Sequence, residues 1–434
     1  MSFKKKFIFI VFLFFIILSL NNFVLADSLK VDSAAAILIE SSSGRILYEK
    51  NAYEKMYPAS TTKVLTAILT LENCKLSDVA TVSSTALDTI PNGYVTANLQ
   101  VGEQLTIKDL LYALMVKSAN DTAVVLAEHI SGSVENFSVL MNQKAKEIGC
   151  LNTNFVNPNG IHDPNHYSTA YDLSLMAQYC MKNEIFRKIV STTSYTLPAT
   201  NMYSSEDRTF SNTNSLIIVN KNNRADNYYY KNAIGIKTGF TSQAKNCLIA
   251  GSLQDGLEFI SVILGAGLTD AGLSQRYLDT INLLNYGYDN FALTKVKEPN
   301  NVATTIEVDK ATRETKSLDL LVKEEITVIN NKTTDVNLIE PEIILKENLI
   351  APITKGDVVG TIKYNVDDIE YSSDLLAAHD VEKSDFSTIL IILGFVIIIL
   401  VLIYFSKPRH NNRKKMKKKK IIKKRNNNDI YSFF

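Results

Sequence analysis

The sequence predicts an α+β fold in which an antiparallel sheet is combined with a helical lobe, followed by a small all-β domain and a C-terminal transmembrane helix. Three observations indicate this organisation. Strand-like, helical and again strand-like patterns follow one another between residues 33 and 288. Short runs of alternating apolar and polar residues replace the helical periodicity after residue 293. Residues 387–405 carry no charge and are long enough to cross a bilayer as a helix.

The first domain begins with a hairpin and continues into helices. Residues 33–50 place a Ser-Ser-Ser-Gly turn between two apolar strands. Pro58 precedes an apolar periodic run, so we expect a helix to begin at Ser60. Residues 106–128 predict two helices with a break near residues 117–120. The other expected elements are helices over 135–148, 169–181 (with Ser168 as N-cap) and 273–288, a strand over 233–238, and a hairpin over 246–266 with a Gln-Asp-Gly turn.

The rest of the chain divides into four parts. Residues 293–377 predict the all-β domain from five alternating runs, NVATTIEV, EEITVIN, TDVNLIE, PEIILKE and GDVVGTIKYNV. Residues 378–386 are a linker, residues 387–405 the transmembrane helix, and residues 406–434 a basic tail.

The N-terminus has the pattern of a secretory signal peptide, residues 1–26. A basic stretch, Lys4-Lys5-Lys6, precedes the uncharged apolar run 7–20, and Val24 and Ala26 supply small residues at −3 and −1 of a cut after Ala26. An uncleaved anchor helix is the alternative, but the run is short for a membrane span.

The charges are sorted along the chain. Although 46 basic residues nearly balance 45 acidic ones, residues 27–385 hold 31 basic and 44 acidic residues, a net charge of −13. Such a body is a poor binder of nucleic acid. The tail carries 12 Lys or Arg between residues 407 and 425, and such segments stay in the cytoplasm. We therefore expect a single-pass protein of the cell membrane with its acidic domains outside.

Neither a metal nor a cofactor is indicated. His162 and His166 lie in a His-Asp-Pro-Asn-His segment that predicts a solvated loop rather than a ligand set. The cysteines have no C-x-x-C or framework spacing and are expected to be buried free thiols: Cys74, Cys150, Cys180 and Cys247.

Three short motifs occur in order along the first domain. They are Ser60-Thr-Thr-Lys63, Ser118-Ala-Asn120 and Lys237-Thr-Gly239. Taken singly, each has an ordinary interpretation. In the first motif Ser60 is a helix N-cap and Lys63 a surface charge, the second motif is a turn, and the third is the end of a strand. Ser242 and Lys245 form a second S-x-x-K outside any ordered trio. The ordered set, in an exported and membrane-tethered protein, favours catalysis.

The first motif pairs a nucleophile with a base. Ser60 and Lys63 are three residues apart at a helix start, so their side chains share one face. A serine hydroxyl needs a base to take its proton, and a lysine can do so only if burial or a second cation lowers its pKa. Lys237, at a strand edge, is a candidate for that cation. The helix N-terminus supplies N–H groups that suit an oxyanion.

The other two motifs offer substrate contacts. Ser118 lies in the predicted break between helices, where its hydroxyl can point into a cleft, and Asn120 offers both a donor and an acceptor there. Gly239 lets a substrate backbone approach closely, while Lys237 and Thr238 can hold a carboxylate.

With their surroundings, these motifs resemble the serine-type D-alanyl-D-alanine carboxypeptidases, the low-molecular-weight penicillin-binding proteins of the peptidase S11 type. The resemblance covers nearly the whole exported part, including YPASTTKVLTA, KSANDTAVVLAEHI, GIKTGFTSQAKNCLIAG and ITKGDVVGTIKY. It implies a transpeptidase/β-lactamase-like catalytic domain over residues 27–292 and a β domain that holds it away from the membrane. Phe240 stands where some relatives have His, and many relatives use an amphipathic anchor instead of a spanning helix.

The resemblance also implies roles for individual residues. Ser60 would attack the peptide bond between the last two D-alanines of a peptidoglycan stem peptide, Lys63 would accept its proton, and Ser118 would relay a proton to the leaving D-alanine. Water would then cleave the acyl-enzyme without a cofactor, and β-lactams would acylate Ser60 as substrate mimics. The implied substrate-binding residues are Asn120 for the substrate amide, Lys237, Thr238 and Arg276 for the carboxylate, Gly239, and Phe240, whose backbone N–H would share an oxyanion hole with that of Ser60.

Other functions share these motifs. A class A β-lactamase needs a Glu after S-x-N, and none occurs between Glu147 and Glu184. A D,D-endopeptidase would use the same nucleophile, and a non-catalytic penicillin-binding wall protein would retain the fold. For Arg276, a helix-surface ion pair is the alternative role. The expected function is removal of the terminal D-alanine during cell-wall maturation.

Overall fold

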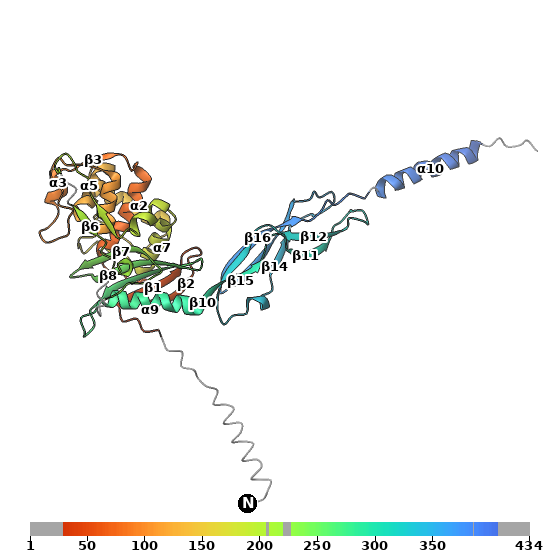
Figure 1. The fold of residues 1–434 in the computed structure, drawn as a ribbon. Helices are drawn as coiled ribbons and strands as arrows, with labels where there is room; N and C mark the ends of the chain where they lie inside the picture. The colour runs from red at the N-terminus through yellow and green to blue at the C-terminus, as the bar shows by residue number, and fades with distance from the viewer. Residues whose placement is uncertain (1–28, 205–207, 220–226, 385, 407–434) are drawn as a thin grey trace, which may run out of the picture. The chain divides into compact units, whose positions relative to one another are not determined.

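The computed structural model describes residues 29–204, 208–219, 227–384 and 386–406 (Figure 1). The predicted signal peptide and the basic tail beyond residue 406 lie outside the described residues. The described residues up to Thr294, together with Val328–Leu338 and Val366–Ile369, form one compact unit, and the rest of the described chain forms a second.

A five-stranded antiparallel sheet forms the centre of the first unit. Its strand order is β2-β1-β9-β8-β7, so the first strands of the chain pair with strands more than 200 residues later. Both predicted hairpins are confirmed. Asp255 and Gly256 have φ angles of 52° and 83°, and a two-residue turn with both angles positive matches the twist of the flanking strands. The strands are β1 (Ala35–Glu40), β2 (Ile46–Lys50), β7 (Ala233–Thr241), β8 (Lys245–Gln254) and β9 (Leu257–Ala266).

Both faces of this sheet are buried, because successive side chains of a strand point to opposite faces. In β1, Ile37 and Ile39 belong to the core shared with the helical lobe, whereas Ala36 and Leu38 belong to the core beneath α9 (Gln275–Asn290). Figure 1 shows α9 on one side of the sheet and α2 and α7 on the other. The sheet is therefore a middle layer between helices.

The helical lobe contains the predicted break. A π-turn ends at Lys117, α5 begins at Asn120, and Ser118 between them has a left-handed backbone with φ of 66°. The predicted N-cap of α7 is wrong by one residue, since the side chain of Thr169, not that of Ser168, accepts the N–H of Asp172. The helical segments of the lobe are η1 (Ala59–Thr62), α2 (Lys63–Asn73), α3 (Ser84–Asp88), α4 (Ile107–Tyr112), η2 (Ala113–Lys117), α5 (Asn120–Ser131), α6 (Val134–Ile148), α7 (Ala170–Met181) and α8 (Glu184–Val190).

Several short elements of the first unit were not predicted. These are α3, α8, the 3₁₀ turn η3 (Ser215–Ile217) and two small antiparallel sheets, in which β3 (Val79–Thr81) pairs with β4 (Gln104–Thr106) and β5 (Ser194–Thr196) with β6 (Thr209–Ser211). Strands of three residues are too short to leave a periodic signal in the sequence.

The second unit confirms the expected all-β domain. Its sheet has the order β11-β12-β16-β15-β14. The strands β10 and β13, which both cross the boundary between the two units, pair in a separate two-stranded sheet. The run at residues 334–340 was predicted as a strand of the β domain but contains the 3₁₀ turn η4 (Val336–Leu338), which belongs to the first unit. The strands are β10 (Phe291–Lys297), β11 (Val302–Glu307), β12 (Ser317–Val322), β13 (Ile326–Asn331), β14 (Glu342–Leu345), β15 (Val358–Val366) and β16 (Ile369–Ala377). The five predicted runs did not include β10, β12 or β16.

The apolar segment near the C-terminus is a helix, α10 (Phe386–Ser406). Its stretch Ile389–Ser406 has a mean hydropathy of 3.2 over 18 residues, and no part of that stretch is buried. By length and composition it can cross a membrane.

Candidate active site

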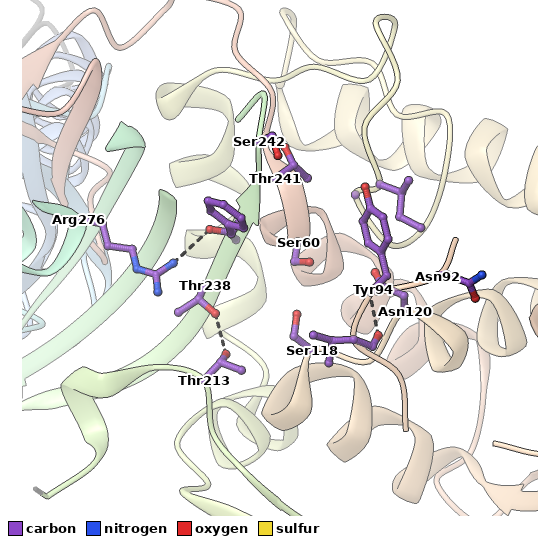
Figure 2. A pocket seen from close by; sticks show the side chains of 16 residues that line it. Ser60, Asn92, Tyr94, Ser118, Asn120, Thr213, Thr238, Thr241, Ser242 and Arg276 are labelled. Atoms are coloured by element: carbon purple, nitrogen blue, oxygen red, sulfur yellow. Dashed lines mark hydrogen bonds between the residues drawn. The ribbon is translucent and has the colours of Figure 1, made fainter. Parts of the chain in front are cut away.

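A pocket of about 480 Å³ lies between the edge strand β7 and the helical lobe (Figure 2). The three sequence motifs meet at this pocket. Lys63 and Lys237 are fully buried rather than on the surface, with 0% and 1% of their areas exposed. The other predicted site residues line the pocket: Ser60, Ser118, Asn120, Thr238, Gly239, Phe240 and Arg276.

Ser60 lies in the 3₁₀ turn η1, which continues without a break into α2 at Lys63, so the helical segment begins at Ala59, one residue before the predicted start. Two threonines close the turn on itself: the hydroxyl of Thr61 donates to the carbonyl of Pro58 at 2.7 Å, and that of Thr62 to Ala59 at 2.8 Å. Ala59 has a φ of 49°, which costs energy in a residue with a Cβ. The candidate nucleophile, Ser60, therefore lies on a turn with a strained backbone that is stabilised by hydrogen bonds within the turn.

Two glycines allow other backbone segments to press against this turn. A Cβ on Gly160 would lie 1.9 Å from the carbonyl oxygen of Ala59. A Cβ on Gly239 would lie 3.2 Å from the backbone nitrogen of Ser60. Residue 160 also has a φ of +80°, so only glycine fits there without strain. Gly239 brings β7 directly beside Ser60.

The amine of Lys63 is surrounded by three oxygen atoms. Its Nζ lies 2.9 Å from Ser60 Oγ, 2.8 Å from Asn120 Oδ1 and 2.6 Å from the carbonyl oxygen of Asn159. Burial, and then the positive charge of Lys237, lower the pKa of Lys63 well below the ordinary 10.5, while Asp121 acts in the opposite direction. An amine that loses its proton more readily than an ordinary lysine therefore lies within hydrogen-bond distance of a serine hydroxyl.

Lys237 lies inside β7, which continues to Thr241, so the prediction that its motif ends a strand is wrong. Its amine donates to the carbonyl of Thr238 at 3.0 Å. Burial and the neighbouring charge of Arg276 lower the pKa of Lys237 to about 7. The predicted second cation is present, but it lies beneath the pocket lining rather than in it.

Ser118 and Asn120 form the floor of the pocket on the helical side. The left-handed backbone of Ser118 turns the chain between η2 and α5. The side-chain amide of Asn120 accepts from Lys63 and donates to the carbonyl of Val95 at 2.9 Å. It therefore links the lysine to Val95, which also lines the pocket.

The side of the pocket along β7 carries donors suited to an anion. Thr238 Oγ1 lies 2.6 Å from Thr213 Oγ1, and Arg276 reaches the carbonyl of Gly239 at 3.2 Å. Within the described part of the chain, the Nε of Arg276 is buried without a hydrogen-bond partner, and Arg276 forms no ion pair. The side chain of Phe240 is 63% exposed at the mouth.

Several residues of this site were not predicted from the sequence. The carbonyl of Asn159 carries no side-chain signal, and Thr213 belongs to none of the motifs. Asn92 and Tyr94 line the wall opposite Arg276 (Figure 2). Only Gly160 had a local signal, in the turn sequence Asn-Pro-Asn-Gly.

His166 corrects the prediction of solvated loop histidines, since it is buried. Its Nδ1 accepts the N–H of Val156 at 3.2 Å, which leaves Nε2 to donate to Thr62 Oγ1 at 2.8 Å. Burial lowers its pKa to about 3, so the ring is neutral. It fixes the loop before Gly160 to the turn that holds Ser60. All four cysteines are free thiols, as predicted, although Cys74 is only half-buried.

Comparison with known proteins gives a consistent result. The family model described as D-alanyl-D-alanine carboxypeptidase matches residues 22–267, and the model described as penicillin-binding protein 5, C-terminal domain, matches residues 291–383. The chain is 33% identical to D-alanyl-D-alanine carboxypeptidase DacF of Bacillus subtilis over 365 residues, which cover 83% of this chain and 88% of that protein.

Two further relatives extend the comparison. The chain is 30% identical to D-alanyl-D-alanine carboxypeptidase DacC of Escherichia coli, over 82% of this chain and 86% of that protein. Its structure resembles penicillin binding protein 5 of Haemophilus influenzae with a TM-score of 0.62 and 27% identity, over 82% of this chain and 98% of the other. The chain therefore belongs to the D-alanyl-D-alanine carboxypeptidase family of peptidases and is a hydrolase of the penicillin-binding protein type.

Proposed function

We propose that this protein removes the terminal D-alanine from peptidoglycan stem peptides through an acyl-enzyme on Ser60, with Lys63 as the base. The observation that carries this proposal is the set of contacts around the Lys63 amine. Asn120 Oδ1 and the carbonyl of Asn159 can only accept hydrogen bonds, so they take both N–H groups of a neutral amine. The remaining lone pair then faces the hydroxyl of Ser60 at 2.9 Å.

The reaction follows from this geometry. Ser60 Oγ forms a bond to the peptide carbonyl while its proton passes to Lys63. The resulting oxyanion is stabilised by the backbone N–H groups of Ser60 and Phe240, which the close approach at Gly239 brings to one side of the pocket. The C–N bond then breaks, and Ser118 passes the proton from Lys63 to the leaving D-alanine. Water, deprotonated by Lys63, attacks the ester and regenerates Ser60.

The substrate carboxylate binds on the β7 side of the pocket. Arg276 lines the pocket and offers its positive charge, and Thr238 offers a hydroxyl already oriented by Thr213. The charge of Lys237 beneath them adds to the positive potential. A β-lactam carries a carboxylate and a strained amide in a similar relation, so it acylates Ser60 in place of the peptide.

Digestion of purified cell wall by the purified full-length protein tests this function. Mass spectrometry of the products is expected to show the loss of one alanine from pentapeptide stems. Cleavage of cross-links would instead favour the D,D-endopeptidase alternative. Wild-type protein that is labelled by fluorescent penicillin but releases nothing would favour a non-catalytic wall protein.

We also propose that the catalytic domain, residues 27–292, and the β domain, residues 293–377, lie outside the cell. The net charge of −13 over residues 27–385, the apolar helix α10 and the basic tail after it support this orientation. In intact protoplasts, added protease is expected to degrade both domains and to leave an epitope at residue 434 protected. Loss of the epitope would contradict the orientation.

A further inference from the structure

One wall of the pocket, residues 92–95, belongs to a segment without helix or strand between α3 and β4. Tyr94 and Val95 are 37% and 46% exposed, so burial of these side chains cannot hold the wall in place. The backbone groups of such a segment need other partners. Buried polar side chains supply them at two points along the chain.

The first point is the start of α5, next to the catalytic motif. The carbonyl of Val95 accepts from both the backbone N–H and the side-chain amide of Asn120, each at 2.9 Å. The buried carboxylate of Asp121 accepts the N–H of Ala97 at 3.0 Å and that of Leu99 at 3.3 Å. These contacts fix one end of the segment.

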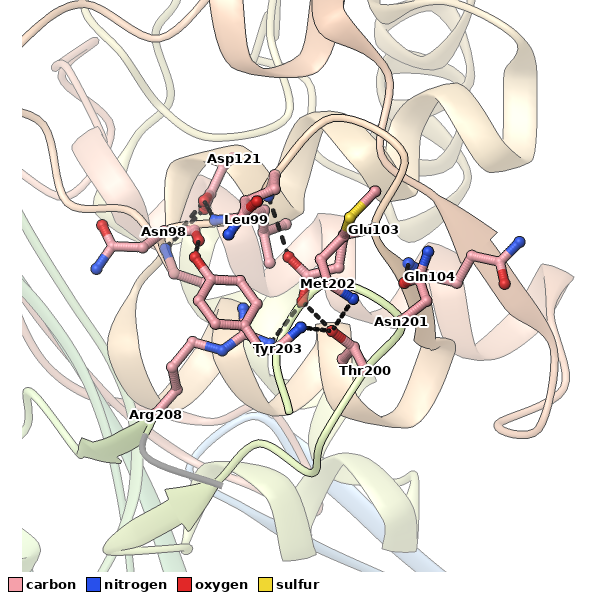
Figure 3. Close-up of polar contacts among 12 residues, drawn as sticks. Asn98, Leu99, Glu103, Gln104, Asp121, Thr200, Asn201, Met202, Tyr203 and Arg208 are labelled. Carbon is pink, nitrogen blue, oxygen red and sulfur yellow. Dashed lines mark hydrogen bonds and ion pairs between the residues drawn. The ribbon is translucent and has the colours of Figure 1, made fainter. Parts of the chain in front are cut away.

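The second point lies away from the pocket and is drawn in Figure 3. The carboxylate of Glu103, which is completely buried, accepts from the N–H of Gln100 at 3.0 Å, from Thr200 Oγ1 at 3.0 Å and from Arg208 at 2.5 Å. The guanidinium of Arg208 lies 3.9 Å from the ring centre of Tyr203, whose hydroxyl donates to the carbonyl of Asn98 at 2.6 Å. Glu103, Arg208 and Tyr203 are called the clamp below.

The clamp residues do not line the pocket, yet their contacts are with the segment that continues into its wall. Figure 2 shows Ser60 between Arg276 on one side and Tyr94 and Asn92 on the other. A substrate whose carboxylate binds near Arg276 and whose carbonyl lies at Ser60 is therefore expected to extend its acyl part towards residues 92–95. We propose that the clamp positions this wall against the acyl side of the substrate, so that Glu103, Arg208 and Tyr203 are positioning residues for substrate selection. This inference depends on the proposed function.

Two β-lactams test the proposal, because they differ only on the acyl side. Benzylpenicillin carries a phenylacetyl group, whereas 6-aminopenicillanic acid has no acyl side chain. The second-order rate constant for acylation of Ser60 is measured with each, in full-length wild-type protein and in the Tyr203→Phe and Glu103→Gln variants. Tyr203→Phe removes one hydroxyl and keeps the ring beside Arg208, so it tests the clamp even where Glu103→Gln fails to fold.

In both variants, the rate constant for benzylpenicillin divided by that for 6-aminopenicillanic acid is expected to fall about fivefold, which is the effect of losing one hydrogen bond. Most of this change should come from slower acylation by benzylpenicillin. Glu258→Gln is the matched control, because Glu258 accepts two hydrogen bonds from Arg187 at 2.9 and 2.7 Å elsewhere in the same unit. It should leave the ratio unchanged.

An unchanged ratio in folded Tyr203→Phe, or equal loss with both compounds, would overturn the clamp while leaving the proposed function intact. Wild-type protein that reacts with neither compound would overturn the proposed function and the clamp together.

Discussion

The two sides of the pocket differ in how their polar groups are paired. On the helical side, the Lys63 amine has three oxygen atoms within 2.9 Å, and Asn120 and Asn159 are themselves held by further hydrogen bonds. On the β7 side, Arg276 makes contacts of 3.2 and 3.3 Å and has a buried Nε without a partner in the described chain.

This difference matches the two tasks of the site. Proton transfer needs donor and acceptor atoms at fixed distances, so the helical side is ordered in advance. Anion binding needs donors that are not already occupied, because buried donors gain most when a charged ligand pairs with them. Mutations on the helical side should therefore reduce the rate of chemistry, and mutations on the β7 side should weaken binding.

Replacing the nucleophile should have the largest effect. Ser60→Ala removes the attacking oxygen and is expected to lower D-alanine release from a pentapeptide by about 10⁴-fold or more. The melting temperature should change little, since the hydroxyl of Ser60 is not part of the core. Retained turnover in this variant would rule out the acyl-enzyme mechanism.

Removing the base should come next. Lys63→Arg places a permanently charged guanidinium where the mechanism needs a neutral amine, and this group cannot release its proton at neutral pH, so acylation by benzylpenicillin should fall by about 10²- to 10⁴-fold. Lys144→Arg is the control, because Lys144 lies on α6 in an ion pair with Glu72. Normal acylation by Lys63→Arg would contradict the division between the two sides.

A change on the β7 side should affect a different constant. Arg276→Gln is expected to raise KM for the pentapeptide by about 10- to 100-fold, with kcat within about threefold of the wild type, because a charge-assisted hydrogen bond to the carboxylate is lost. Steady-state kinetics measure both constants. A fall in kcat at constant KM would mean that Arg276 takes part in the chemical step. The proposed difference between the helical side and the β7 side would then be wrong.

The pH dependence separates the two sides without mutation. Burial and the charge of Lys237 both lower the pKa of Lys63, so Lys63 becomes a base at a lower pH than an ordinary lysine does. The value of kcat/KM should therefore rise with pH as Lys63 becomes a base. It should fall about tenfold per unit above about pH 7, where Lys237 loses the charge that attracts the carboxylate. A plateau up to pH 9 would exclude this role for Lys237.

Much of this protein was predictable from local sequence. The hairpin turn at Asp255 and Gly256, the break before α5 and the apolar helix α10 each depend on residues close together in the chain. The three motifs also identified five of the sixteen residues that line the pocket, and these five include the candidate nucleophile.

Tertiary structure decided the rest. Asn159, whose carbonyl completes the Lys63 site, lies 96 residues beyond it, and Thr213 reaches Thr238 across 25 residues. A backbone carbonyl has no residue-specific signal, and hydrophobic periodicity predicts which face is buried but not which segment covers it. His166 shows the same limit: a polar loop is buried where distant backbone and hydroxyl groups satisfy its hydrogen bonds.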